Sequence, residues 1–188
     1  MTAYTTVLFL HAIAIFVLIA ALTMEGWMLF RLRRTANWID VRAWMLPVPG
    51  ITVAGTSSLA IVFVTGAYLT ESLKAWDFAW PRFAVLEIVL FAMLGILTGR
   101  RLREIRRISN GVLKNQPAWH SRAGNFWLKL SLSMRIWIVF GATLLTAVKP
   151  GFRESLGIVV TSVLIGCACS FATVGGQKAI SPRAASPQ

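Results

Sequence analysis

Five long apolar runs divide this chain, and they constrain its fold more than any other feature. Hydropathy places them at about residues 5–30, 48–69, 80–99, 130–148 and 155–174. Each is about 20 residues or longer, the length that an α-helix needs to cross the hydrocarbon core of a bilayer. A helix also satisfies its own backbone hydrogen bonds without water. We therefore expect an all-α integral membrane bundle of five transmembrane helices, forming one domain over residues 1–176, and a flexible cytoplasmic tail at 177–188.

The basic residues between the runs predict the orientation of the chain. Four Lys and Arg residues lie in 31–42, eight in 100–129 and two in the tail, against four on the opposite side. Cytoplasmic loops of membrane proteins carry the excess of Lys and Arg. We therefore expect the N-terminus outside the cell and the C-terminus in the cytoplasm, in a multi-pass protein of the cytoplasmic (inner) membrane.

A lipid environment also explains the net charge of +12. Only 14% of the residues are charged, whereas soluble domains usually carry about a quarter. No RNA- or DNA-binding motif accompanies the charge, so we expect no nucleic-acid partner. The stretch "RRLREIRRISNGVLK" predicts a basic amphipathic extension of the third helix that suits anionic lipid head groups, the alternative being charge that only sets topology. Its arginines are Arg100, Arg101, Arg103, Arg106 and Arg107.

Small residues within the runs mark candidate helix contacts. Gly95 and Gly99 have the GxxxG spacing, and the second and fifth runs contribute Gly55 and Gly166. Such residues let backbones approach closely where no hydrophobic effect drives helix association.

Four ionisable residues fall inside the predicted spans, although each costs a few kcal/mol or more in hydrocarbon. At 1.5 Å per residue, His11 and Glu87 lie about 10 Å from the outer ends of their spans, and Glu25 and Arg135 about 8 Å from the inner ends. Each level thus holds one potential cation and one acid. His11 and Glu25 also differ by only about 40° around their helix. We therefore predict an outer His11–Glu87 contact and an inner Glu25–Arg135 contact.

These predicted pairs have two interpretations. In the first, they are structural staples that set the register of the helices. In the second, they mark a proton or ion path, because intramembrane acids and histidines commonly do so. The apolar stretch Val17–Leu22 between the two levels favours the staple.

Other chemistries find less support in the sequence. Cys167 and Cys169 are one residue apart and point in different directions on a helix, so packing explains them better than metal binding. No nucleophile–base pair, phosphate loop or metal-binding motif occurs. His11 is the only histidine within a span and so the one weak candidate for a haem ligand. We expect no enzymatic activity, no metal and no cofactor.

Three stretches carry a resemblance to a known family: "LHAIAIF" in the first span, "TGAYLTESLKAWDFAWPR" between the second and third, and "TAVKPGFRESL" after the fourth. With the spans placed, the chain resembles a family of small bacterial integral membrane proteins that has no settled activity. That family is distantly similar to the membrane domain of copper-resistance D proteins. The resemblance implies a helical bundle in a bacterial inner membrane, and copper handling would map onto His11 alone.

The expected function is therefore that of a non-enzymatic integral membrane protein, such as an accessory or assembly subunit. The alternative is a small transporter or ion-conducting protein that uses the buried polar pairs, and a haem- or copper-linked redox protein is less favoured. Expected partners are the bilayer itself, with anionic lipids at the basic segment, and either a protein partner or further copies of the chain.

Overall fold

The computed structural model describes residues 3–34, 43–110 and 126–175, and these ranges are helical apart from short turns. All five expected membrane-crossing helices are present, and each is long and apolar enough to cross a membrane. This confirms the five-helix architecture predicted from hydropathy. A short 3-10 helix, η1 (Ala75–Asp77), joins the second to the third. The five long helices are α1 (Ala3–Arg34), α3 (Val48–Ser72), α4 (Ala79–Asn110), α6 (Phe126–Val148) and α7 (Phe152–Gly175).

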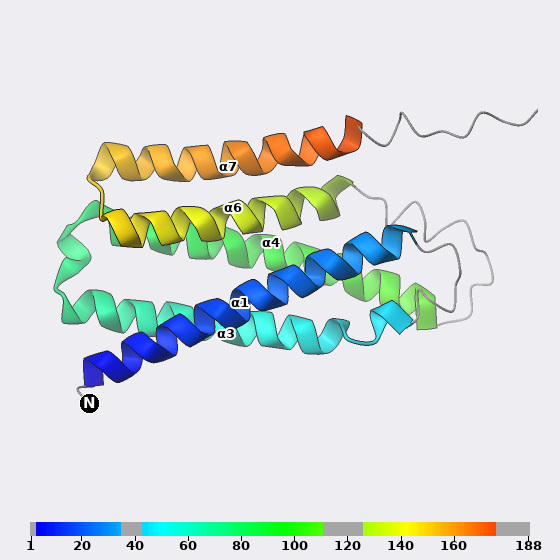
Figure 1. Ribbon diagram of the computed structural model, residues 1–188, viewed down its shortest axis with the longest axis horizontal. Helices are drawn as coiled ribbons and strands as arrows, with labels where there is room; N and C mark the ends of the chain where they lie inside the picture. Colours follow the sequence, from blue (N-terminus) through cyan, green and yellow to red (C-terminus); the bar gives the residue numbers. More distant parts are fainter. Residues whose placement is uncertain (1–2, 35–42, 111–125, 176–188) are drawn as a thin grey trace, which may run out of the picture.

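The long helices run side by side along the molecule and define two ends (Figure 1). One end holds the start of α1, η1 and the turn between α6 and α7, and we call it the Trp76 end. The other holds the ends of α1 and α4 and the start of α6, and we call it the Arg103 end.

The helices associate in two groups. α1 packs along α3, and α4 packs against α6, which in turn packs along α7. Contacts between this α1–α3 pair and the α4–α6–α7 group are much sparser and involve mainly α3 with α4 and a short stretch of α1 with α6. α1 crosses the bundle obliquely, and α7 lies along the edge farthest from α3 (Figure 1).

Two apolar clusters hold the two groups together. The first, midway along the bundle, contains Leu18 and Leu22 of α1, Phe91 of α4 and Ile138 of α6. The second lies at the Arg103 end and joins α1, the start of α3, α4 and α6; its members are Met28, Leu29, Leu32, Met45, Val48, Leu102 and Leu128. The helices are joined mainly by these clusters and by a few polar contacts.

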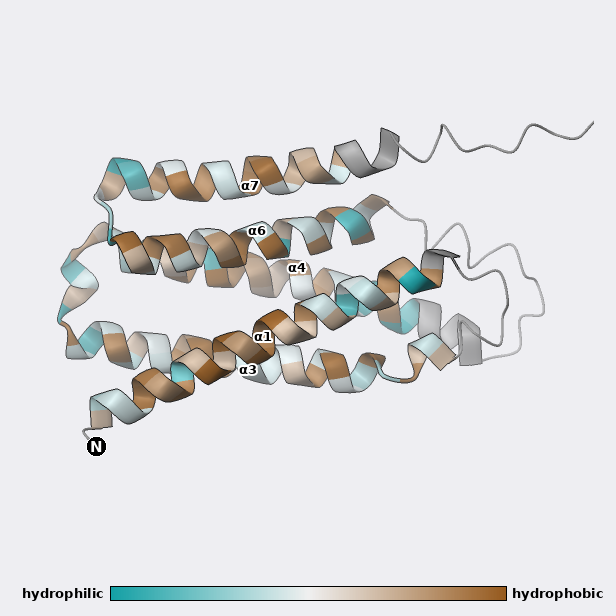
Figure 2. Ribbon diagram, viewed as in Figure 1, coloured by the Kyte–Doolittle hydropathy of each residue, from teal (hydrophilic) through white to brown (hydrophobic). Residues whose placement is uncertain are grey.

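Large apolar side chains that are exposed on the outer surface outnumber those that are buried in this core. Phe16 is 72% exposed, and Phe9, Val64, Phe140 and Leu164 are also exposed. Figure 2 shows hydrophobic residues along the middle of every long helix. Such an outer surface would be unfavourable in water and is favourable against lipid chains.

Local chemistry explains where several helices begin and end. Pro47 precedes α3, where its missing N–H costs nothing. Lys149 ends α6 in the left-handed conformation, with φ of 53°, while its N–H donates to Leu145 O at 3.0 Å. Pro150 follows and prevents the helix from continuing.

α4 continues without a break through the basic segment, so the expected extension of the third helix is present. Leu102 is buried there, whereas Arg100, Arg101 and Arg103 are exposed. The side chains of Arg106 and Arg107, the rest of the long loop at 111–125, and the tail at 177–188 lie outside the described residues.

Candidate functional site

The four ionisable residues predicted within the spans come from three helices. His11 and Glu25 lie on α1, Glu87 lies on α4, and Arg135 lies on α6. Glu87 and Arg135 are almost fully buried, with 1% and 5% of their surface exposed, and His11 and Glu25 are partly exposed. The packing of α1 against its neighbours decides which of them meet.

The structure brings Glu25 and Arg135 together. Arg135 Nη2 donates to Glu25 Oε1 at 2.5 Å, and Arg135 Nε donates to Ser131 O at 3.4 Å. The guanidinium also lies over the ring of Phe91, 5.8 Å from its centroid. Such a charge-assisted bond within an apolar bundle ties α1 to α6.

The structure does not bring His11 and Glu87 together. His11 Nδ1 instead lies 2.7 Å from Thr65 Oγ1 on α3. The single proton of that hydroxyl is already donated to Ile61 O at 2.5 Å, so Thr65 Oγ1 accepts a hydrogen bond from His11 Nδ1–H.

Glu87 faces the other side of α4, towards α6 and α7. A Cβ built on Gly141 of α6 would collide with both Glu87 Oε1 and Ser162 Oγ of α7. Neither carboxyl oxygen of Glu87 has a hydrogen-bond partner among the described residues. His11 and Glu87 lie at about the same depth but do not pair. The first half of α1, which carries His11, packs along α3, whereas Glu87 faces α6 and α7.

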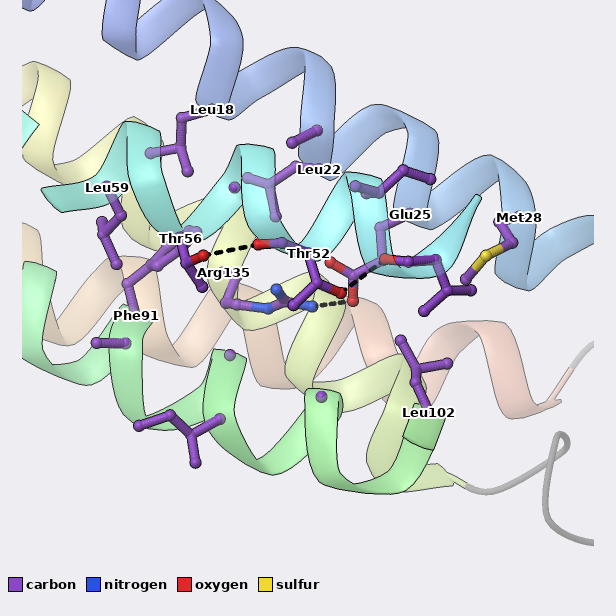
Figure 3. A pocket seen from close by; sticks show the side chains of 18 of the residues that line it. Leu18, Leu22, Glu25, Met28, Thr52, Thr56, Leu59, Phe91, Leu102 and Arg135 are labelled. Atoms are coloured by element: carbon purple, nitrogen blue, oxygen red, sulfur yellow. Dashed lines mark hydrogen bonds and ion pairs between the residues drawn. The ribbon is translucent and has the colours of Figure 1, made fainter. Parts of the chain in front are cut away.

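The Glu25–Arg135 ion pair lies in the wall of a cavity of about 300 Å³ between α1, α3, α4 and α6. We call it the Glu25 cavity. Figure 3 shows Glu25 and Arg135 meeting there, with Thr52 and Thr56 of α3 on one side and Phe91 of α4 on the other. Arg103 lines it as well, so this cavity extends towards the Arg103 end.

A second cavity, of about 410 Å³, occupies the half of the bundle nearer the Trp76 end. We call it the His11 cavity. It is lined by the same four helices and by η1, and its walls include His11, Trp76, Trp80 and Lys149. The two cavities share three wall residues, Leu18, Leu59 and Phe91, which form an apolar layer between them.

The predicted packing glycines have different surroundings. A Cβ at Gly166 would come within 2.9 Å of the Met134 backbone, so this glycine permits a close approach of α6 and α7. A Cβ at Gly55 would make an ordinary contact with Ala21 on α1, at 3.6 Å. Gly95 and Gly99, despite their GxxxG spacing, line the Glu25 cavity rather than a tight helix contact.

Besides the His11–Thr65 hydrogen bond, two further contacts between helices were not predicted from the sequence. One is the hydrogen bond between Thr98 of α4 and Ser131 of α6, at 2.6 Å. The other is the approach of Gly141 and Ser162 to Glu87. Hydroxyl residues are frequent in all the spans, so their positions do not indicate which of them bond between helices. The usable signal in the sequence was Gly141, a small residue that leaves room for a buried acid on a neighbouring helix.

Binding of a metal would need more donors than these residues provide in one place. Within 3–34, 43–110 and 126–175, no three His, Cys, Asp or Glu side chains are grouped closely enough to hold a metal ion. Cys167 and Cys169 are free thiols.

The chain matches no family model, no curated protein and no solved structure.

Proposed function

We propose that this protein is a non-enzymatic membrane carrier in which a small solute passes between the α1–α3 pair and the α4–α6–α7 group. The supporting observation is the position of the Glu25–Arg135 ion pair in the wall of a cavity. A purely structural staple is expected to be packed dry, whereas a binding site needs space beside its polar groups. The ion pair is the solute-binding site in this proposal.

The arrangement of the two cavities suits alternating access. Each extends towards a different end, and the apolar layer of Leu18, Leu59 and Phe91 separates them. Contacts between the two helix groups are sparse, so a small rocking of one group against the other costs few interactions. Such a motion would open one cavity while closing the other.

The charges in the Glu25 cavity indicate the class of solute. Its lining is mostly apolar and includes one acid, Glu25, and two arginines, Arg103 and Arg135. Arg135 Nη2 bonds Glu25, while Nη1 lies 4.0 Å from the point where a Cβ on Gly95 would sit. A guanidinium binds carboxylates and phosphates through two nitrogens. We therefore expect a small amphiphilic solute with an anionic group.

The orientation and location predicted from the sequence belong to the same proposal. The Arg103 end faces the cytoplasm of a bacterial cell, with the N-terminus outside, and anionic lipids contact Arg100 and Arg101. The resemblance to the family related to copper-resistance D membrane domains stays a prediction.

A second candidate function is that of an accessory or assembly subunit, as a homo-oligomer or with a protein partner. The Thr98–Ser131 hydrogen bond and the Glu25–Arg135 ion pair are compatible with it, because both join helices of one chain without needing a solute. The two functions differ in whether water reaches the cavities.

Cysteine accessibility tests the proposal without knowledge of the solute. In a background with Cys167 and Cys169 replaced by Ala, Thr56→Cys places a thiol in the Glu25 cavity and Thr143→Cys places one in the His11 cavity. A membrane-impermeant maleimide should label these thiols in sealed vesicles from opposite sides. The matched control is Phe16→Cys, which faces outward among apolar side chains and should remain unlabelled.

Two outcomes would contradict the carrier. If neither cavity thiol reacts while the vesicles label a loop control such as Lys74→Cys, the cavities are dry and the assembly role is favoured. If Phe16→Cys reacts as fast as Thr56→Cys, water reaches the whole helix surface and the cavities have no special role.

A further inference from the structure

Glu87 is the buried ionisable group that the carrier proposal does not use. It is not among the residues lining either cavity. It is 1% exposed, and neither carboxyl oxygen has a hydrogen-bond partner in the described part of the chain. A buried polar group without a partner costs free energy, so its presence needs an explanation.

The surroundings of Glu87 provide space for the carboxyl group, and among the described residues no cation balances its charge. Gly141 leaves the room in which Glu87 Oε1 and Ser162 Oγ face the same point. Arg135 precedes Gly141 by six residues, about 9 Å along the helix, and is bonded to Glu25. Arg82 lies five residues before Glu87 and therefore about 140° around α4. The other charged residues on these helices lie towards the two ends of the bundle: Lys149, Arg153 and Glu154 at the Trp76 end, and Arg100, Arg101, Arg103, Glu104 and Lys129 at the Arg103 end.

The ligand that fits this site is a proton. An ionised carboxylate without a counter-charge is very costly in an apolar interior, whereas the neutral acid is not. The neutral acid also gains an O–H donor that can reach a neighbouring hydroxyl oxygen. One carboxyl and one hydroxyl offer far fewer oxygens than the six or more that hard metal cations usually take.

We propose that Glu87 is a proton-binding site whose occupancy is linked to the packing of α7 against α4 and α6. The carboxyl holds its proton while the three helices are packed as observed. It releases the proton when the helices separate enough for water to reach Gly141 and Ser162. This inference does not rest on the carrier function, because it concerns a different face of α4.

Carbodiimide labelling tests the site directly. Dicyclohexylcarbodiimide is apolar and adds to a protonated carboxyl: the acid proton moves to a nitrogen, the carboxyl oxygen bonds the central carbon, and rearrangement leaves a stable N-acylurea. We expect an adduct at Glu87 in the membrane-embedded protein, detected by peptide mass spectrometry, that decreases at least severalfold between pH 6 and pH 9. Glu25, whose carboxylate is ion-paired, should remain unmodified, and Glu87→Gln should abolish the adduct.

Three outcomes would overturn this inference. The first is no adduct at Glu87 at pH 6, under conditions in which another membrane protein's buried acid is labelled. The second is labelling that is constant from pH 5 to pH 9, which would show that Glu87 does not release its proton in this range. The third is protection of Glu87 by Na⁺ and not by choline, which would identify a metal cation as the ligand. None of these depends on solute flux.

Thermal stability provides an independent readout. Glutamine has the shape of the neutral acid, so Glu87→Gln should unfold in detergent near the wild-type temperature at pH 6. At pH 9 the wild type should lose stability and Glu87→Gln should not, because only the wild type acquires a buried charge. Glu71→Gln, at an exposed carboxyl near the end of α3, is the control and should follow the wild type. A parallel decline of Glu87→Gln and the wild type would contradict the proposal.

Discussion

Glu25 and Arg135 lie 110 residues apart in the chain, and their side chains form an ion pair of 2.5 Å between α1 and α6. It joins the α1–α3 pair to the α4–α6–α7 group, between which contacts are sparse, and it lines a cavity. The pair thus connects the two parts of the bundle beside the Glu25 cavity.

Removing one partner of this pair should destabilise the protein more than removing both. Glu25→Leu or Arg135→Met should each cost up to about 3 kcal/mol, because the remaining charge is buried without its partner. The double variant Glu25→Leu/Arg135→Met should recover much of this loss. Thermal unfolding in detergent measures all of these variants. Strictly additive effects would show that the two side chains do not interact.

Gly141 should tolerate no larger side chain. In Gly141→Ala, the added methyl group collides with Glu87 and Ser162, and overpacking of this kind typically costs about 1–3 kcal/mol. Gly157→Ala on α7 is the control, since its Cβ would have no other atom within 4 Å. Combining Gly141→Ala with Glu87→Ala should restore part of the lost stability. Equal unfolding temperatures for Gly141→Ala and Gly157→Ala would contradict the described packing.

Gly166 and Gly95 should respond differently to the same substitution. Gly166→Ala brings a methyl group against the Met134 backbone and should destabilise by about 1–3 kcal/mol. Gly95→Ala should be neutral or stabilising by up to about 1 kcal/mol, because its Cβ enters a cavity and alanine favours helix. Comparing the unfolding midpoints of the two variants with that of the wild type tests this difference. A large loss in Gly95→Ala would mean that α3 and α4 pack more closely than described.

The His11–Thr65 hydrogen bond should make a modest contribution to stability. Thr65→Val keeps the branched shape and removes the acceptor, so we expect a loss of about 0.5–1.5 kcal/mol. Thr65→Ser retains the hydroxyl and is the matched control. In the background of His11→Phe, Thr65→Val should have almost no further effect. If Thr65→Val destabilises the His11→Phe variant as much as the wild type, Thr65 does not bond to His11.

The apolar layer between the cavities should act as a barrier. Truncating Leu18 and Phe91 to alanine removes much of the wall that both cavities share. The thiol of Thr56→Cys should then react with impermeant maleimide from both sides of sealed vesicles rather than from one. Leu164→Ala, on an outward-facing site of α7, should leave the one-sided reaction unchanged. Unaltered sidedness in the layer variant would show that the cavities are not connected there.

Much of the architecture follows from local properties of the chain. Each apolar run is long enough to be recognised without its neighbours, so all five helices were predicted within a few residues of most of their ends. The extension of α4 to Asn110 was predicted from the amphipathic pattern of its basic segment, because no apolar run marks that end. The levels of His11, Glu25, Glu87 and Arg135 along the helices also follow from residue counting.

The sequence by itself determined which segments are helices and how far along each helix a polar group lies. Only the tertiary structure decided which groups meet, because two residues at the same level can face different neighbours. The oblique path of α1 brings Glu25 to Arg135 of α6 and places His11 beside Thr65 of α3. Glu87 instead faces Gly141 and Ser162. Helix direction and rotation depend on the packing of all the side chains together, and no single stretch of sequence contains that information.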